Sequence, residues 1–441
     1  MAEQPPNRVQ HEGSPSEPIA SPARVGRPIL VQKYGGSSVA DVDRIGKVAD
    51  RVVAAKRAGS DVVVVVSAMG KTTDGLLALA RQAANAGLGA GAAADPPRRE
   101  LDMLLSTGER VSMALLSIAI QARGFEAISF TGSQSGILTN DRHFDARIIE
   151  VRPFRIEDEL ARGRIVIVAG YQGMSYRREI TTLGRGGSDT TAVALAAALG
   201  AERCEIYSDV DGVYSADPRV VPDARHLPEL DCAVLQEMAE CGAKVVCAQA
   251  VEWARRSGVA LYARSTFDAL DALDGADAPR AGSGAKQTVV RRFAPGSAPR
   301  ARAIVAEGNV VLARVHGGLK LDELLRAAGD LGIGLRDLSF AGGGGAFVIP
   351  LLNVPDWQGA KRRITALLPA VELAEGLASV SVVGDGLTAT AEPLARFVDV
   401  LGRAGITPRL TVAGPLRLGA LIAASEAEPA QRLLHASFVE A

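Results

Sequence analysis

Short apolar runs alternate with Ala- and Leu-rich stretches from residue 29 onward, and this alternation restricts the fold more than any other feature. The runs occupy residues 29–34, 61–66, 165–169 and 204–207, and each ends in small or polar residues. The stretches between them, such as 111–123 and 190–199, have helical spacing. Strands that are apolar throughout are buried on both faces. The pattern therefore predicts an α/β fold, with a mainly parallel sheet sandwiched by helices.

Charge and hydropathy exclude two classes of partner. The 441 residues carry 49 basic against 50 acidic side chains, with no long Lys/Arg run, so the chain lacks the positive field that nucleic acid requires. The longest apolar run lies near residues 62–66, far short of the roughly 20 residues of a membrane helix. The four cysteines form no CxxC pair, which is typical of a reducing compartment and predicts a cytoplasmic protein.

Composition also predicts the domain boundaries. Residues 1–27 are rich in Pro, Ser and Glu without an apolar period, which predicts a disordered tail. Periodicity fades again over residues 268–302, which we interpret as a linker region. Beyond it, Leu-Gly-Ile at 331–333 recurs as Ala-Gly-Ile at 404–406, each followed by an arginine, Arg336 and Arg409. This repeat predicts two small duplicated α+β units.

The first strand runs into Lys33-Tyr34-Gly35-Gly36-Ser37-Ser38. Glycines let backbone N–H groups approach an anion, and a lysine adds a point charge, so this turn is suited to phosphate. The lysine precedes the glycines, so the turn is not a Walker loop. The alternative is a tight turn with a surface lysine.

The third run leads to Thr181-Thr182-Leu183-Gly184-Arg185-Gly186-Gly187-Ser188-Asp189-Thr190-Thr191, which opens an Ala-rich helix. Arg185 offers a planar fork for a carboxylate. Asp189 is either an N-terminal cap of that helix or an acceptor that orients lysines around a transferring phosphoryl group.

The fourth run ends in Ser208-Asp209-Val210-Asp211-Gly212-Val213-Tyr214, followed by Ala216-Asp217-Pro218-Arg219. These carboxylates, the aromatic ring and the arginine suit a nucleotide and, through water, a magnesium ion. Turn chemistry explains Asp-Gly and Asp-Pro equally well. Lys244 is either a solvated helix residue or a second cation that reaches phosphate.

Together these segments, with Ser106-Thr107-Gly108-Glu109-Arg110, are similar in order and spacing to the aspartate kinases over about residues 29–265. The resemblance implies an amino-acid-kinase catalytic domain at 28–267 and two ACT-like domains at 303–378 and 379–441. It further implies ATP, Mg²⁺ and L-aspartate as reactants, 4-phospho-L-aspartate as product, and a homo-oligomer that dimerises through the ACT-like domains. The alternatives are a kinase for another acidic amino acid and a non-catalytic regulatory subunit.

The resemblance also implies roles for single residues. Lys33, Asp189 and Lys244 are expected to be catalytic, with Asp189 orienting the two lysines. The expected aspartate contacts are Thr73, Glu109, Arg185, Gly187 and Ser188. The expected nucleotide contacts are Lys33, Gly35, Gly36, Ser37, Ser67, Ser208, Asp209, Tyr214, Arg219 and Lys244. No protein metal ligand is expected.

These expected roles fit the chemistry, because a carboxylate nucleophile is already ionised and needs no strong general base. We therefore interpret His143 as a structural or rim residue.

The chain departs from the family pattern in two places. Cys247-Ala248-Gln249 replaces the usual continuation after Lys244, which we expect to alter packing more than chemistry. In the C-terminal part, Arg336 and the glycine-rich segment 341–345 stand where an effector's ammonium would need acceptors. We therefore expect weakened feedback by lysine or threonine.

Overall fold

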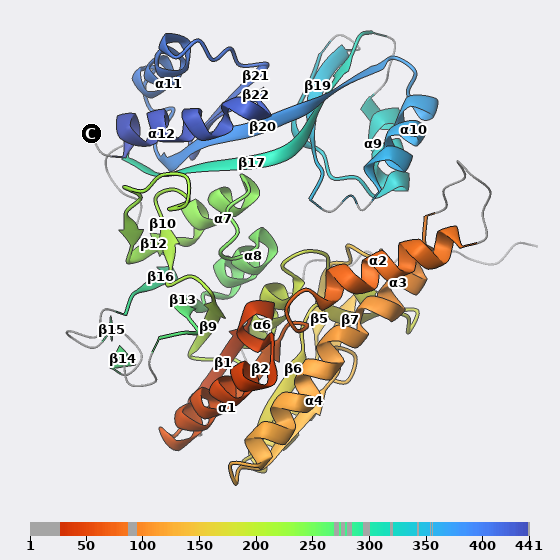
Figure 1. Cartoon of the computed structure of the whole chain (residues 1–441), viewed down its shortest axis with the longest axis vertical. Coiled ribbons are helices and arrows are strands. Elements are labelled where there is room, and N and C mark those ends of the chain that lie inside the picture. Colours follow the sequence, from red (N-terminus) through yellow and green to blue (C-terminus); the bar gives the residue numbers. More distant parts are fainter. Residues whose placement is uncertain are drawn as a thin grey trace, which may run out of the picture.

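The computed structural model describes residues 27–86, 95–268, 273–274, 278–279, 285–293, 300–317, 321–341, 344–352, 354 and 356–439. The expected tail, residues 1–27, lies outside the described residues except for Arg27, and much of 268–302 lies outside them as well. Figure 1 shows an N-terminal α/β unit with a second, C-terminal unit above it.

An eight-stranded sheet forms the centre of the N-terminal unit, and its middle strands are parallel. In spatial order the strands are β12 (Glu229–Asp231), β16 (Gln287–Arg291), β13 (Ala260–Ser265), β9 (Arg203–Ser208), β1 (Ile29–Tyr34), β2 (Asp61–Val66), β6 (Ile165–Ala169) and β3 (Ala127–Phe130). Only β12 and β16 run against the others. The α/β expectation with a mainly parallel sheet is confirmed.

Successive valines of β2 point to opposite faces of this sheet, and helices cover both faces. Val62, Val64 and Val66 pack with α1 (Val42–Arg57) and α4 (Thr107–Gln121). Val63 and Val65 belong to the core of the other face. The helices on that face are α5 (Phe154–Ala161), α6 (Gly187–Ala198), α7 (Cys232–Glu240) and α8 (Ala248–Ser257). This burial on both sides explains why the strands lack period-two alternation.

Smaller elements surround the large sheet. A four-stranded sheet has the order β5 (Ile148–Val151), β4 (Ile137–Thr139), β7 (Gln172–Ser175) and β8 (Ile180–Thr182). Two short ribbons pair β10 (Val213–Tyr214) with β11 (His226–Leu227), and β14 (Leu273–Asp274) with β15 (Ala278–Pro279). The remaining helices are the 3-10 turn η1 (Gly36–Val39), α2 (Thr72–Asn85) and α3 (Arg98–Leu105).

One helical stretch, Arg98–Gln121, is long and apolar enough to span a bilayer by length and composition alone. It comprises α3 and α4. Leu116 and Ile120 of this stretch pack into the core beside the sheet, and Asp102 and Glu109 are buried carboxyls. Such one-sided packing is typical of a core helix of an α/β protein.

The C-terminal unit is one six-stranded antiparallel sheet with two helices at each end. Its strand order is β18 (Arg336–Ala341), β19 (Gly344–Pro350), β17 (Arg300–Val315), β20 (Val371–Asp385), β22 (Arg417–Ala423) and β21 (Leu410–Gly414). We name the end with α9 (Leu321–Leu331) and α10 (Trp357–Leu367) the first lobe. The second lobe carries α11 (Glu392–Arg403), η2 (Ala424–Glu426) and α12 (Ala427–Phe438).

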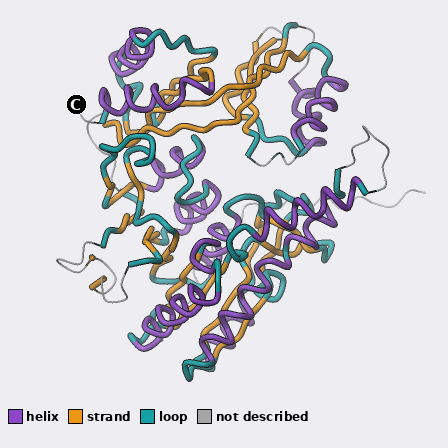
Figure 2. Tube along the Cα trace, in the orientation of Figure 1, coloured by secondary structure: helices purple, strands orange, loops and turns teal. Residues whose placement is uncertain are grey.

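Both lobes repeat the order strand, helix, strand, strand, helix, and they share β17 and β20 (Figure 2). The expected duplication therefore has a structural counterpart. The expected boundaries differ from the structure in three places. Residues 287–291 form β16 of the large sheet rather than a linker, because Val290 is buried in its core. β17 begins at Arg300, and the expected division at 378/379 falls inside β20.

Candidate active site

The carboxyl ends of β1, β2, β6 and β9 lie along one edge of the large sheet, because these four strands are parallel neighbours. The glycine turn after β1, the start of α6 and the start of α4 contribute side chains at this edge. In open α/β sheets, ligands bind in the crevice outside these strand ends.

Lys33 and Asp189 form an ion pair with an Nζ–Oδ1 distance of 2.7 Å. Lys33 stands on β1 and Asp189 in the first turn of α6. Their side chains are only 11% and 9% exposed, so Lys33 is not the surface lysine of the alternative interpretation. Gly186 is the N-cap residue of α6 and Asp189 lies in the first turn, so Asp189 does not occupy the capping position.

Because Gly36 has no side chain, the backbone of the segment after β2 lies close to the glycine turn after β1. A Cβ at this position would lie 2.9 Å from the Ala68 carbonyl oxygen and 3.1 Å from that of Gly70. The Gly36 carbonyl accepts a hydrogen bond from Gly70 N–H at 3.0 Å. The turn after β1 is thereby joined to the segment after β2, where Ser67 N–H donates to the Tyr34 carbonyl at 3.1 Å.

Glu109 supplies a buried carboxyl from the first turn of α4. Its Oε1 accepts the Ala68 N–H at 3.1 Å, and its Oε2 is a buried oxygen with no hydrogen-bond partner among the described residues. Burial raises the pKa of Glu109 to about 7, against the two backbone hydrogen bonds that lower it. Such a carboxyl gains much from a cation delivered by a ligand.

The other expected aspartate contacts lie around the start of α6. Ser188 is buried and Gly187 opens the helix. Arg185 has an exposed side chain 4.0 Å from Asp74, in the first turn of α2. This contact brings the glycine loop toward α2, where Thr73 precedes Asp74. The structure thus brings the expected aspartate residues to one end of the sheet.

A second cluster surrounds the ribbon β10–β11. The Tyr214 hydroxyl donates to Asp211 at 2.9 Å, and Arg219 binds both carboxylate oxygens of Asp217, at 2.9 and 2.7 Å. The same arginine lowers the pKa of Asp217, and the charge of Lys244 lowers it further. Asp209 similarly raises the pKa of Arg219. The Ser208 hydroxyl lies 3.3 Å from Val210 N.

Asp189 is expected to orient both lysines; in the structure it pairs with Lys33, and the orienting role stays a prediction. Lys244 is exposed in the turn between α7 and α8, and no ion pair in the described part of the chain joins it to Asp189.

Sequence reasoning missed Asp102, which is fully buried on α3. It accepts hydrogen bonds from Thr182 Oγ1 at 2.5 Å and from Phe144 N–H at 3.0 Å, and it lies 2.6 Å from His143 Nδ1. Burial raises the pKa of this carboxyl. His143 therefore tethers α3 to the loop after β4. The sequence signal for its burial was the position of this carboxylate between two apolar residues of the core, Leu101 and Leu105.

Cys247, for which an effect on packing is expected, packs against the glycine loop. Its Sγ lies 3.1 Å from the Gly186 carbonyl oxygen and 3.2 Å from Thr190 Oγ1. Burial raises its pKa to about 11, so the thiol stays protonated and donates. Gly186 has φ +76°, and a Cβ there would lie 2.4 Å from the Cys247 Cβ.

The described residues contain no group of three His, Cys, Asp or Glu side chains able to hold a metal ion.

Comparison with known proteins gives a consistent result. A model of the amino acid kinase family matches residues 28–264. The chain is 42% identical to the aspartokinase of Mycolicibacterium smegmatis and 40% identical to that of Corynebacterium glutamicum, each alignment covering 93% of this chain and 96% of the relative. Escherichia coli aspartokinase III in complex with aspartate and ADP superimposes with a TM-score of 0.77 at 27% identity, covering 93% and 100% of the two chains. The lysine and aspartate complex of that enzyme gives 0.65.

Proposed function

The chain belongs to the amino acid kinase family and, within it, to the aspartokinases, and from this premise we propose which of its residues carry the reaction. The enzyme transfers the γ-phosphoryl group of ATP to the β-carboxylate of L-aspartate and forms 4-phospho-L-aspartate. The observation that carries the proposal is the buried Lys33–Asp189 ion pair beside the glycine turn.

In the proposed mechanism, a β-carboxylate oxygen attacks the γ-phosphorus while the bond to the bridging oxygen of ADP breaks. No proton moves, so the protein needs to position the reactants and neutralise charge. Lys33 offers its ammonium to the transferring phosphoryl group, and Asp189 holds that ammonium in place. Lys244 neutralises the nucleotide phosphates.

Aspartate is proposed to bind between the starts of α4 and α6. The unpartnered Oε2 of Glu109 accepts the substrate's ammonium, and the guanidinium of Arg185 binds a carboxylate. The neighbouring contacts are assigned to Thr73, Gly187 and Ser188.

ATP is proposed to lie across β1 and β9. Its remaining contacts are Gly35, Gly36, Ser37, Ser67, Ser208, Asp209, Tyr214 and Arg219. Mg²⁺ bound with ATP beside these residues would supply positive charge against the charge of the transferring group.

An ADP-release assay with ATP and L-aspartate, L-glutamate or no acceptor tests this proposal. We expect turnover with aspartate and little with glutamate. The Arg185→Ala variant should raise KM for aspartate by about tenfold or more and leave KM for ATP unchanged, since it removes a carboxylate partner. A change confined to ATP would assign Arg185 to the nucleotide, and turnover with glutamate alone would assign another substrate.

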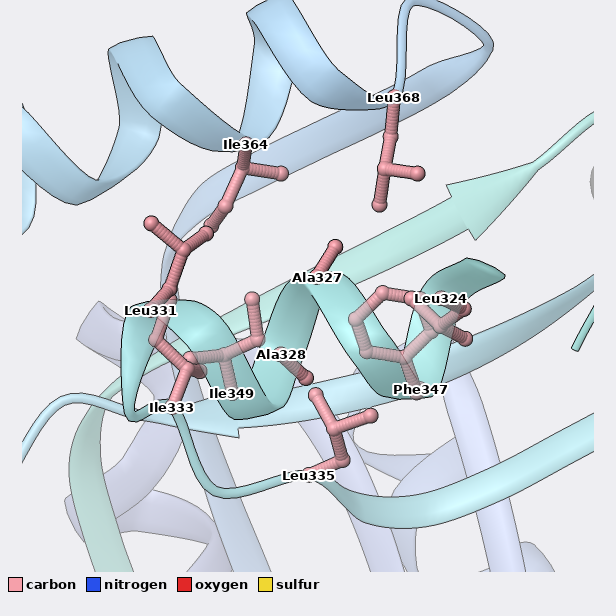
Figure 3. Close-up of a pocket in the computed structure, with 10 residues that line it drawn as sticks. All are labelled: Leu324, Ala327, Ala328, Leu331, Ile333, Leu335, Phe347, Ile349, Ile364 and Leu368. Carbon is pink, nitrogen blue, oxygen red and sulfur yellow. The ribbon is translucent and has the colours of Figure 1, made fainter. Parts of the chain in front are cut away.

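We further propose that the C-terminal unit is an ACT-type regulatory part with weakened feedback. Among the described residues, the side chains that line the cavity between α9 and α10 (Figure 3) are all apolar: Leu324, Ala327, Ala328, Leu331, Ile333, Leu335, Phe347, Ile349, Ile364 and Leu368. None of them offers a partner for an effector's charges. Arg336 binds Glu307 and the Glu240 carbonyl, each at 2.6 Å, and so serves contact with α7.

Dimerisation through this unit and a cytoplasmic location complete the proposal. The outer strands β18 and β21 each pair on one side only within the described residues, which leaves edges that a second copy could extend. The four cysteines are all free, as suits a reducing compartment. Analytical ultracentrifugation at micromolar concentration tests the dimer.

A further inference from the structure

The ribbon β10–β11 belongs structurally to both units of the protein. Its strands extend from the N-terminal unit, and Figure 1 shows β10 directly beneath β17 and α12. The loop between its strands contributes Ala216 and Val221 to the hydrophobic core of the second lobe, where Ile304 and Leu434 also lie. The nucleotide residues proposed above, Tyr214 and Arg219, are on this ribbon and loop.

Ser215 is the point at which the ribbon is fixed. It is fully buried, and its N–H donates to the Arg225 carbonyl at 2.8 Å. Its carbonyl accepts the Ile304 N–H of β17 at 2.7 Å. Its hydroxyl accepts the Arg225 N–H at 2.8 Å and lies 2.8 Å from His435 Nε2.

His435 approaches Ser215 from α12 and is also fully buried. A hydroxyl has one proton and two acceptor sites, so Ser215 can accept from Arg225 and donate to the imidazole at once. One turn earlier on α12, Arg432 Nε donates to the Val220 carbonyl at 2.9 Å. Helix α12 thus forms two polar contacts with the ribbon and its loop, one buried and one exposed, in addition to the hydrogen bond from β17.

We propose that His435 is a positioning residue for the nucleotide: through Ser215 it fixes the ribbon that presents Tyr214 and Arg219. The inference rests on the nucleotide placement proposed above. His435 touches no substrate and acts on ATP alone, because the proposed aspartate contacts lie at the starts of α4 and α6. An apolar residue at 435 would leave the proton of the buried Ser215 hydroxyl without an acceptor. The loop would then shift until this proton finds another hydrogen-bond partner.

The test compares His435→Leu with His435→Gln, whose amide can reach the Nε2 position, in the full-length protein. We expect His435→Leu to raise the dissociation constant for ADP with Mg²⁺, measured by titration calorimetry, and KM for ATP by about tenfold. KM for aspartate should stay within a factor of about two. His435→Gln should restore most of the affinity. His316→Leu is the matched control, since His316 is an exposed histidine of the first lobe.

A double-mutant cycle identifies the route. If His435 acts through Ser215, Ser215→Ala should weaken ADP binding less in the His435→Leu background than in the wild-type protein, where it also removes the hydrogen bond to His435. Fully additive losses would overturn the inference. So would a folded His435→Leu protein with unchanged ADP affinity, or one whose KM for aspartate rises equally.

Two further variants keep the outcome decisive. Should His435→Leu not fold, the exposed Arg432→Ala is expected to weaken ADP binding two- to threefold, and unchanged binding would refute the proposal.

Arg219→Ala examines the nucleotide placement separately. If it leaves ADP affinity intact, the proposed nucleotide site is wrong. If it weakens ADP while His435→Leu does not, only the positioning role is wrong.

Discussion

At the scale of single residues, the proposed catalytic pair Lys33–Asp189 can be compared with a structural ion pair of the same chain. Lys56 and Asp61 form a comparable pair, with an Nζ–Oδ1 distance of 2.9 Å and side chains 7% and 17% exposed. Asp61 begins β2, at the opposite edge of the sheet from the strand ends that form the site. The chain therefore contains a matched control for the loss of a buried ion pair.

Lys33→Ala and Asp189→Ala should each lower kcat by about a hundredfold or more, because each removes charge directed at the transition state. Lys56→Ala should lower the melting temperature to a similar extent yet keep kcat within a factor of about two. Steady-state kinetics and thermal melts on the three variants check this. Near-normal turnover in Lys33→Ala would remove that residue from the mechanism.

Glu109 should make aspartate use depend on pH. With a pKa near 7 in the empty enzyme, the carboxyl is mostly protonated at pH 6 and cannot accept an ammonium. We expect kcat/KM for aspartate to fall about tenfold per pH unit below 7, while kcat/KM for ATP at saturating aspartate changes little. Glu109→Gln should be far less active and lose this pH profile. An unchanged profile in the variant would point to a different group.

The raised pKa of Glu109 also makes the free energy of unfolding depend on pH. Low pH favours folding, whereas it disfavours aspartate binding. Because the folded-state pKa of Glu109 is raised from 4.5 to about 7, folding favours the protonated form. This contribution is complete below pH 4.5 and is lost as the pH rises through 7. Aspartate binding should offset the loss.

At the scale of elements, the strands of the large sheet were predictable and the residues that brace the site were not. The runs at 29–34, 61–66 and 165–169 are strands with those bounds, because burial on both faces leaves a continuous apolar signature. Asp102 and Cys247 act through partners 80 and 61 residues away in sequence, Thr182 and Gly186. Periodicity within one segment contains no information about such contacts.

Gly186→Ala tests how tightly the glycine loop is held. A left-handed φ costs an alanine about 1 kcal/mol, and here the new Cβ would also collide with Cys247. Gly258 is the control, since it caps α8 at φ +80° with open space around it. We expect both variants to lose stability but only Gly186→Ala to lower kcat, by about tenfold or more. Equal kinetics would mean that Cys247 yields without moving the loop.

At the scale of the whole molecule, the chain superimposes better on E. coli aspartokinase III in complex with aspartate and ADP than on the same enzyme in complex with lysine and aspartate, with TM-scores of 0.77 and 0.65. The sequence repeat predicted that two lobes exist. It could not predict that they share β17 and β20, because a strand's length does not reveal how many units it serves.

The proposal of weakened feedback concerns this whole arrangement. An effector shifts activity only by binding one conformation better than another. We expect millimolar lysine and threonine, alone or together, to change the initial rate by less than about twofold. Strong inhibition that is abolished by substitutions within 316–345 would restore ordinary feedback control.

The shared strands also restrict where residues can be inserted into the chain or deleted from it. β17 and β20 pair from Arg300 and Asp385 to Val315 and Val371, so one backbone ladder sets the register of both lobes. Because side chains alternate between faces, a codon inserted within β17 would turn one lobe's core residues outward. The three register shifts, at Ala301/Ala303, Glu307/Val310 and Val310/Leu312, are exceptions, since a bulge absorbs an extra residue. Insertions and deletions in β17 should therefore be tolerated at these shifts and selected against elsewhere along the strand.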